Sequence, residues 1–265
     1  MFTCLYKCGS SAPSTQKYHV YPASASTMDL ILPTGVVCDK CNSYFSKLEK
    51  YFTERHPGAS TRLLAVEKTR KGKAPVLFTR TGTAFRKDRD GKQNFTFPLD
   101  DLQIRIKQDG NIDIVGETKL SPFDATMISR VLAKIALESL WWLMSEINPF
   151  SEQFDPLRTY ARFGKGCQSF IWFAYRLNQQ HQLPPHLVPV TDREGQCIGK
   201  FSLIFFPGIQ YLLSLLPIML PSQLRGLEEW TLVTTPGMIE RKSVDLKVEL
   251  VQITEEEMKM RKDAF

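Results

Sequence analysis

The chain has 265 residues, of which 43% are hydrophobic and 23% charged, and its formal net charge is +6. This composition excludes a largely disordered chain and is typical of a globular protein with a small module and one larger domain. The charge is uneven, because residues 1–95 carry 16 Lys and Arg against 7 Asp and Glu, whereas residues 96–265 carry 18 against 21. A basic half attracts nucleic acid through its phosphates, although a solvated charged surface is the alternative.

Two close pairs of cysteines come first along the chain. They are Cys4-x3-Cys8 and Cys38-x2-Cys41. Tetrahedral zinc needs four thiolate or imidazole donors, and two such pairs joined by a loop supply them. Buried free thiols and disulfides are the alternatives, but the spacing favours a metal, so we predict one structural zinc ion bound by all four cysteines. A closed site of this kind leaves no coordination position for a substrate.

The second cysteine pair leads into a segment with helical periodicity, which we expect to end at His56-Pro57-Gly58. Its apolar arc consists of Tyr44, Phe45, Leu48, Tyr51 and Phe52. The basic residues Lys40, Lys47 and Lys50 fall on a neighbouring stripe of the same helix. We predict that the arc packs in the core and that the three lysines contact nucleic-acid phosphates.

Several short motifs in the first 75 residues belong together. They are His19-Val20-x-Pro22, then Gly35-Val36-Val37-Cys38-Asp39-Lys40-Cys41-Asn42 with Tyr44-Phe45, and finally Lys71-Gly72-Lys73-x-Pro75. In this combination they resemble the zinc-stapled branch of the HNH, or His-Me finger, endonucleases over residues 1–75. The segment from Ile128 to Leu137 resembles, more weakly, the carboxy-terminal halves of longer bacterial members of the family.

The resemblance implies a treble-clef-like ββα module that hydrolyses phosphodiester bonds of DNA with one divalent cation, Mg²⁺ or Mn²⁺. In such a module His19 is the general base that activates water, and Asn42 orients the site or reaches the cation. The residues alone also allow a hydrogen-bonded structural histidine and a helix-capping asparagine. The residue before the histidine is usually acidic in this family but is Tyr18 here, and Asp29 is the candidate substitute ligand.

Beyond residue 75 the sequence predicts short β-strands, then a long helix, then more strands. The first strands are expected at 75–78, 83–85, 94–97, 102–106 and 112–115, the last two joined by a turn at 108–111. The helix is expected to start at Ser121-Pro122 and to continue through Trp141-Trp142 as the central core helix of this half. Later strands are expected at 170–175, 198–206, 230–233 and 244–251, and residues 178–189 are expected to form a polar connection.

No secretory signal and no membrane span are expected. The start of the chain lacks a basic run followed by an apolar stretch, so we expect a cytoplasmic location with reduced thiols. Residues 201–221 carry no charge, but Pro207-Gly208 and Pro217 interrupt them, which favours a buried strand, a turn and a short apolar element. The remaining isolated candidates are interpreted as structural or surface residues: Cys167, Cys197, His181 and His186.

We therefore predict an α+β protein with two parts. Residues 1–75 form a small zinc-stapled ββα module of the HNH type, and residues 76–265 form a larger mixed α+β domain with a central long helix. The preferred function is metal-dependent endonuclease activity on DNA, with a structural zinc ion and a catalytic Mg²⁺ or Mn²⁺. The alternative is a catalytically degraded module that binds nucleic acid or a partner without cleaving it.

Overall fold

The structure of the protein is a computed structural model of the whole chain. It describes residues 2–22, 25, 29–55, 76–78, 84–87, 93–96, 103–106, 112–115, 122–143, 147–165, 171–176, 185–191, 197–206, 209–216, 231–234, 238–240 and 247–248. Both helices and antiparallel sheets are present, so the α+β class is confirmed. None of the helices in these ranges is both long enough and apolar enough to cross a membrane.

The amino-terminal part is a β-hairpin followed by a helix. Strand β1 (Tyr18–His19) pairs antiparallel with β2 (Ile31–Leu32), with His19 opposite Ile31. Helix α1 (Asp39–Arg55) starts inside the second cysteine pair, with an acidic residue in its first turn and a basic residue in its last, as the helix dipole favours. Of the predicted apolar arc, Phe45, Leu48 and Phe52 are buried in the core, whereas Tyr44 and Tyr51 are only partly buried.

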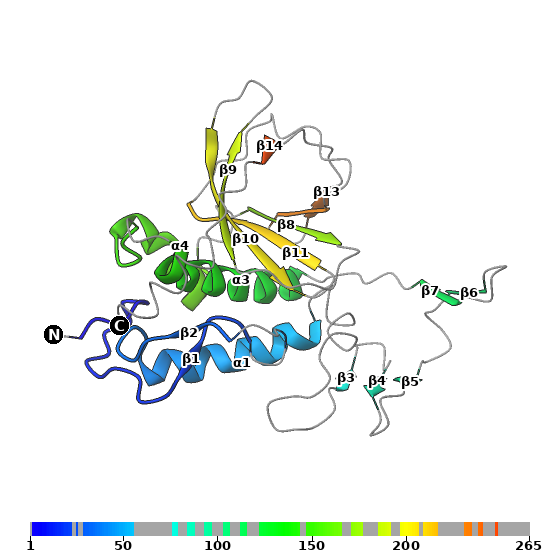
Figure 1. Ribbon diagram of the computed structural model, residues 1–265, viewed down its shortest axis with the longest axis horizontal. Coiled ribbons are helices and arrows are strands. Elements are labelled where there is room, and N and C mark those ends of the chain that lie inside the picture. The colour runs from blue at the N-terminus through cyan, green and yellow to red at the C-terminus, as the bar shows by residue number, and fades with distance from the viewer. Residues whose placement is uncertain are drawn as a thin grey trace.

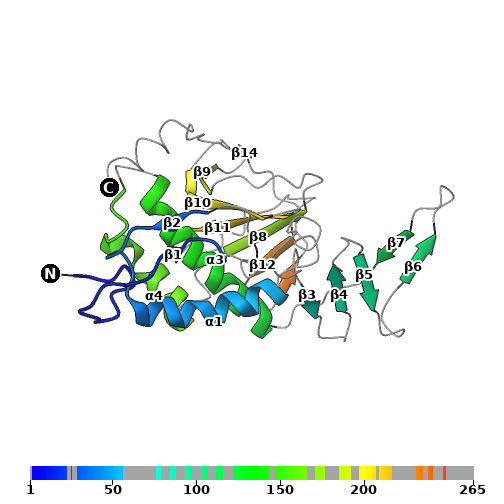
Figure 2. The same ribbon diagram turned by 60° about the horizontal axis from the view of Figure 1, so that its bottom comes forward.

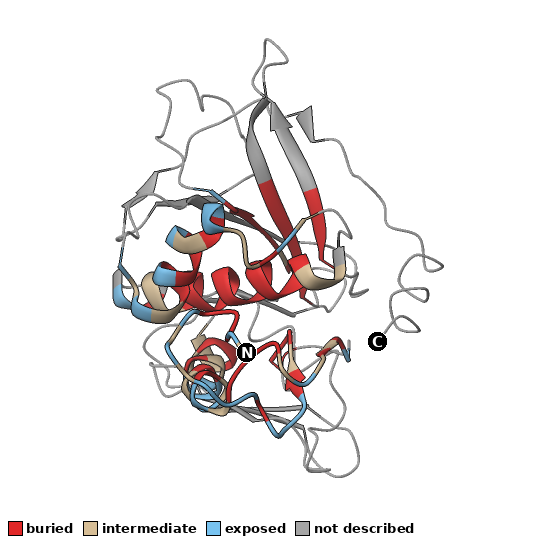
Figure 3. Ribbon diagram, turned by 90° about the vertical axis from the view of Figure 1, so that its left-hand side faces the viewer, coloured by how far each residue is buried: buried red, intermediate tan, exposed pale blue. Residues whose placement is uncertain are grey.

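Helix α3 (Pro122–Leu143) lies between this amino-terminal part and the largest sheet (Figure 1). Every residue from 128 to 140 is buried, so the helix is covered on all sides, as Figure 3 shows. Helix α3 packs against α1, against strands of the sheet, and against the shorter helix α4 (Asp155–Phe163), which follows the 3-10 turn η1 (Glu152–Phe154). The predicted central core helix is therefore present.

The largest sheet has seven antiparallel strands in the order β13-β12-β8-β11-β10-β9-β14. Their bounds are β8 Ile171–Arg176, β9 His186–Thr191, β10 Cys197–Phe206, β11 Ile209–Ser214, β12 Thr231–Thr234, β13 Met238–Glu240 and β14 Lys247–Val248. Strand β10 is the longest of them, and within the uncharged segment 201–221 the described residues 201–206 and 209–214 form the hairpin of β10 and β11. Almost all of these residues are buried, as expected for a core segment, and residues 217–221 lie outside the described residues.

Five short strands lie between α1 and α3 in sequence. Strands β3 (Val76–Phe78), β4 (Ala84–Lys87) and β5 (Gln93–Thr96) form one small sheet, and β6 (Gln103–Ile106) pairs with β7 (Ile112–Val115). Figure 2 shows them to one side of the helices, beyond the end of α1. All five coincide with predicted strands or overlap them.

Two predictions about the second half were wrong or incomplete. Residues 178–189 were expected to form a polar connection, but β9 begins within them at His186. Pro189 suppressed the strand signal because it cannot donate to a sheet ladder, yet it lies in register opposite Lys200 of β10. Helix α4 was not predicted at all, although Pro156 near its start and Gly164 after its end are typical helix boundaries.

One continuous core joins the two halves of the chain. The same cluster of buried apolar residues contains side chains of the hairpin and α1, of α3 and α4, and of strands β9 to β11. Phe52 of α1, for example, lies 5.1 Å from the ring of Phe206 on β10. The domain boundary at residues 75 and 76 stays a prediction, but the described core does not stop there.

The face of α3 that meets the amino-terminal part is polar. Arg130, Lys134 and Glu138 recur at intervals of four residues, which places them on one stripe of the helix. Arg130 donates hydrogen bonds to the hydroxyl of Tyr44 and to carbonyls at the end of α4. Glu138, completely buried, accepts a hydrogen bond from the hydroxyl of Tyr6. We call these three residues the polar stripe of α3.

Lys134 is the centre of the polar stripe. Its ammonium group is fully buried and donates to the carbonyl oxygens of His19 and Val20, each at 2.7 Å. It also lies 2.6 Å from a carboxylate oxygen of Glu49 on α1 and 3.1 Å from one of Glu138. Burial alone lowers the pKa of this ammonium, but the two carboxylates more than offset that effect and the pKa is raised. Lys134 is therefore held charged between three elements.

We expect the substitution Lys134→Met to destabilise the protein by about 3–5 kcal/mol, because it leaves the buried carboxyl group of Glu138 and the carbonyls of His19 and Val20 without their partner. Urea denaturation followed by circular dichroism measures the change. Lys165→Met, at an exposed lysine, is the control and should stay within about 0.5 kcal/mol of the natural protein. Adding Glu138→Gln to Lys134→Met should recover part of the loss, and no recovery would show that the buried charge is not its cause.

Candidate metal centre

The four cysteines of the two predicted pairs come together in the structure. The sulfur atoms of Cys4, Cys8, Cys38 and Cys41 all lie within 4.8 Å of one another, and no disulfide joins them. Sulfur atoms bound tetrahedrally to zinc at 2.3 Å lie roughly 3.8 Å apart, so the cluster has the size of a zinc site. Three of the cysteines are buried and Cys8 is partly exposed. The residues present therefore fit a metal ion such as zinc.

The local backbone explains how each pair is held. After Cys4 the chain turns sharply, with the amide of Lys7 donating to the carbonyl of Cys4 at 2.7 Å and Lys7 itself in a left-handed conformation. The amide of Leu5 donates to the carbonyl of Val36 at 2.8 Å, which fixes the first pair against the second. The second pair occupies the start of α1, where the amide of Cys41 points at the sulfur of Cys38. Helix amides of this kind favour thiolates.

The start of α1 is also tied to the preceding loop. Asp39 accepts hydrogen bonds from the hydroxyl of Ser14 at 2.9 Å and from the amide and hydroxyl of Thr15. These bonds, the one from Ser14 first, hold the pKa of the Asp39 carboxyl below its usual value. The ionised carboxylate interacts favourably with the helix dipole at the first turn of α1, and its hydrogen bonds keep the loop beside the cysteine cluster.

The thiols share protons when no metal is bound. A hydrogen bond from Cys41 lowers the pKa of Cys4 to about 5, with help from backbone amides, whereas the same interaction raises the pKa of Cys41. Burial raises the pKa of Cys8. A zinc ion would replace these protons, since zinc binds thiolates and releases protons as it does so. The chemistry it would supply here is structural, because the four cysteines would fill all of its ligand positions.

A second feature of the hairpin is a contact between the predicted base and a carboxylate. The Nδ1 atom of His19 lies 3.0 Å from an oxygen of Asp29, just before β2. The His19 side chain is 13% exposed, whereas that of Asp29 is 73% exposed, so the pair lies at the surface edge of the hairpin. Asp29 was considered as a cation ligand, but here it binds the histidine. A carboxylate on Nδ1 holds the proton on that atom and leaves Nε2 as the basic nitrogen.

Tyr18, where an acidic residue was expected, points into the protein. It is buried, and the ammonium of Lys134 lies 4.9 Å from the centre of its ring. Burial raises the pKa of its hydroxyl well above the usual value, and Glu138 adds to the effect, so the phenol stays neutral. A neutral buried phenol is not an oxygen ligand for Mg²⁺ or Mn²⁺.

Asn42 lies in the first turn of α1 and is partly exposed. Its amide donates to the carbonyl of Cys38 at 3.0 Å, so the residue belongs to the helix and is not its cap. Seven residues separate it from Glu49, which places both on one flank of α1. Glu49 contacts Lys134, which in turn binds the carbonyl of His19, so this flank faces the hairpin. Asn42 therefore lies on the side of α1 that faces the strand of His19.

The three predicted nucleic-acid contacts, Lys40, Lys47 and Lys50, are all exposed. At 100° per residue, Lys40 and Lys47 lie roughly 140–160° around the helix from Asn42. Lys50 lies between the two sides. The structure therefore puts the His19 and Asn42 side of α1 apart from the side that carries Lys40 and Lys47.

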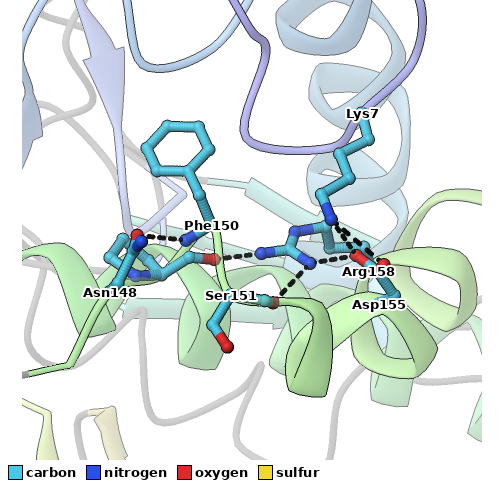
Figure 4. A network of polar contacts seen from close by, with 7 residues as sticks. Lys7, Asn148, Phe150, Ser151, Asp155 and Arg158 are labelled. Atoms are coloured by element: carbon cyan, nitrogen blue, oxygen red, sulfur yellow. Dashed lines mark hydrogen bonds and ion pairs between the residues drawn. The ribbon is translucent and has the colours of Figure 1, made fainter.

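A polar network joins the first cysteine turn to α4 (Figure 4). Lys7 forms an ion pair with Asp155 at 2.7 Å, and Asp155 also binds the buried Arg158. Arg158 donates in turn to the carbonyl of Ser151 at 3.0 Å and to that of Pro149. The exposed ion pair between Lys7 and Asp155 contributes little to stability by itself. Asp155 also contacts the buried Arg158, whose hydrogen bonds hold the segment before α4 in place.

Sequence reasoning missed the polar stripe of α3, Asp29 as the partner of His19, and the ends of α4. The spacing of Arg130, Lys134 and Glu138 in an otherwise apolar helix was an available signal. Of the other candidates, the motif Lys71-Gly72-Lys73-x-Pro75, Cys167 and His181 lie outside the described residues. Comparison of the chain with family models, with curated proteins and with solved structures found no match.

We expect the purified protein to contain about one zinc ion per chain, because four thiolates at this spacing form a closed site. Elemental analysis measures the content. Cys38→Ser should lose most of the metal and lower the unfolding midpoint, since Cys38 is completely buried at the start of α1. Ser10→Ala, a partly exposed position beside the first pair, is the control. Unchanged zinc in the Cys38→Ser protein would contradict this assignment.

Proposed function

We propose that the protein is a metal-dependent endonuclease of the HNH type that hydrolyses phosphodiester bonds in DNA. The contact between His19 and Asp29 is the observation that carries the proposal. A general base needs its proton fixed on one ring nitrogen so that the other can accept a proton, and a carboxylate on Nδ1 fixes the proton there. The surrounding geometry supports it, because the histidine lies on the first hairpin strand and the helix begins within the second cysteine pair.

In this proposal the protein holds the base in place through its backbone. Lys134 donates to the carbonyls of His19 and Val20, so the strand cannot move without breaking two charge-assisted hydrogen bonds in the interior. Asp29 orients the imidazole ring from the surface side. His19 then accepts the proton of the attacking water through Nε2.

A catalytic Mg²⁺ or Mn²⁺ would stabilise the charge on the scissile phosphate and on the leaving oxygen. The residues that would offer it oxygen atoms are Asp29, with its exposed carboxylate, and Asn42. Tyr18 does not take part, because its side chain is buried beside Lys134. The basic half of the chain supplies the attraction for the substrate's phosphates.

The buried Tyr18 is also the observation that favours a second candidate. If the lost carboxylate at this position is not replaced by Asp29, the module binds nucleic acid or a partner without cleaving it. In that case His19 and Asp29 form a structural hydrogen bond at the edge of the hairpin. The two candidates differ in one measurable property, which is cleavage.

We expect His19→Ala to lower the rate of Mn²⁺- or Mg²⁺-dependent nicking of supercoiled plasmid by about a hundredfold to ten-thousandfold, the usual cost of removing a general base. Asp29→Asn should also slow nicking, because it removes the charge that favours the protonated imidazole. Glu152→Gln, at an exposed carboxylate of η1, is the matched control and should keep the natural rate.

Zinc content and affinity for DNA should be unchanged in the His19 and Asp29 variants, since neither residue binds the structural metal. Absence of nicking by the natural protein across a broad screen of cations and pH, with DNA binding retained, would support the non-cleaving candidate. Equal rates in the natural and His19→Ala proteins would remove His19 from the mechanism.

A further inference from the structure

The flank of α1 that faces away from the hairpin forms a surface of its own. Lys40, Tyr44, Lys47 and Tyr51 lie on it, because they recur at intervals of three and four residues. We call it the outer flank of α1. Helices α3 and α4 border it: the hydroxyl of Tyr51 donates to Asp124 on α3, and Tyr44 accepts from Arg130. Figure 2 shows α1 alongside both helices.

Two exposed phenylalanines border the outer flank. Phe123, in the first turn of α3, and Phe163, at the end of α4, are each 58% exposed and are the most exposed large apolar side chains among the described residues. Each is associated with a tyrosine of α1. The ring of Phe123 meets that of Tyr51 edge to face at 5.7 Å. Phe163 is linked to Tyr44 through Arg162, whose guanidinium lies 5.4 Å from the Phe163 ring and 3.6 Å from the Tyr44 ring.

These contacts hold the two rings in fixed places. Tyr44 and Tyr51 are seven residues apart, a distance of about 10.5 Å along the helix. The two exposed rings therefore stand at two points along α1 with Lys47 between them. Leaving two phenylalanine rings exposed to water is unfavourable, since each exposes a large apolar area. Such rings are suited to contact with a flat partner.

The charge of this surface is positive. Lys40, Lys47 and Lys165 are exposed, and Arg162 of α4 adds a guanidinium over the ring of Tyr44 of α1. The carboxyl end of α4 would ordinarily repel anions, but Arg130 donates to the carbonyl of Ala161 at 3.2 Å and to that of Arg162 at 2.7 Å.

Carboxylates do not cancel this charge. Asp124 is buried and holds the hydroxyl of Tyr51, so it does not face the surface. Glu54, near the end of α1, is the described carboxylate nearest to this flank in the helical repeat, and the neighbouring Arg55 has the opposite charge. The outer flank therefore combines stacking rings with several cations.

We propose that the outer flank of α1 binds single-stranded nucleic acid, with bases stacked on Phe123 and Phe163 and phosphates beside Lys40, Lys47 and Lys165. Exposed aromatic rings interleaved with cations are the means by which proteins bind single strands without sequence preference. A duplex keeps its bases stacked on each other, so it cannot use the two rings. The proposal takes the ligand class from the proposed function, but it concerns a surface on the other side of α1 from His19.

The test compares binding of a fluorescently labelled single-stranded oligonucleotide with that of the duplex of the same sequence, by anisotropy, without added divalent cation. Phe163→Ala and Phe123→Ala should each weaken single-strand binding about tenfold, since a base stacked on an aromatic ring contributes about 1–3 kcal/mol. Their affinity for the duplex should change less than about twofold. Lys47→Gln should weaken both forms and reduce the dependence of affinity on salt.

Leu216→Ala is the matched control, because Leu216 is an exposed apolar residue after β11 and belongs to none of the three helices that form or border the outer flank. Unchanged single-strand affinity in both phenylalanine variants overturns the proposal, and so does an equal loss for the duplex. Absence of any binding to either form also overturns it and points to a protein partner for the two rings. Circular dichroism and zinc content show that the variants fold.

The result separates this proposal from the nuclease proposal. If the natural protein does not nick DNA but the phenylalanine variants lose single-strand binding, the surface is confirmed and the nuclease is not. If His19-dependent nicking is present while the phenylalanine variants bind single strands normally, the nuclease is confirmed and the surface is not.

Discussion

The buried ammonium group of Lys134 is the constraint on which the amino-terminal half depends. An isolated charge in a protein interior is strongly unfavourable, so it must be surrounded by partners at every position where it can donate. Here the partners are the carbonyl of His19 at the end of β1, the carbonyl of the next residue, Val20, and carboxylates of α1 and α3. All of these elements must be in place together, because the absence of any one leaves a buried charge or carbonyl unpaired. The position of the hairpin relative to α3 is thereby fixed.

This constraint explains how such a short amino-terminal segment forms a stable structure. A hairpin with two-residue strands and one helix bury too little apolar surface to fold alone, and small modules of this size usually need a metal or a neighbouring surface. The structure shows a neighbouring surface and a cysteine cluster that could hold a metal ion. The cluster joins the two ends of the amino-terminal loop region, and Tyr6 and Tyr18 are buried beside Glu138 and Lys134 of α3. A metal ion in the cluster would therefore stabilise the same segment that packs on α3.

The elements that could be predicted from the sequence are those encoded by local patterns. The cysteine spacing predicted the cluster, and helical periodicity predicted α1 and α3, because each signal lies within a short stretch of chain. The contact between His19 and Asp29 and the burial of Tyr18 could not be derived in this way. They depend on where the loop after β1 returns and on Lys134, which is 115 residues from His19 in the sequence. Strand β9 was missed because Pro189 has a low strand propensity that the neighbouring β10 overrides.

The same geometry gives α1 two separate surfaces. One stripe of the helix is committed to the core through Cys41, Phe45, Leu48 and Phe52, and the helix contacts other elements on the two sides of that stripe. On one side Glu49 fixes the helix to Lys134 and the strand of His19. On the other, Tyr44 and Tyr51 support exposed rings from α4 and α3. Because the core stripe cannot rotate without exposing these apolar side chains, the two surfaces keep a fixed relation. A nucleic-acid strand held on the outer side would therefore have to cross to the other side of α1 to reach the histidine.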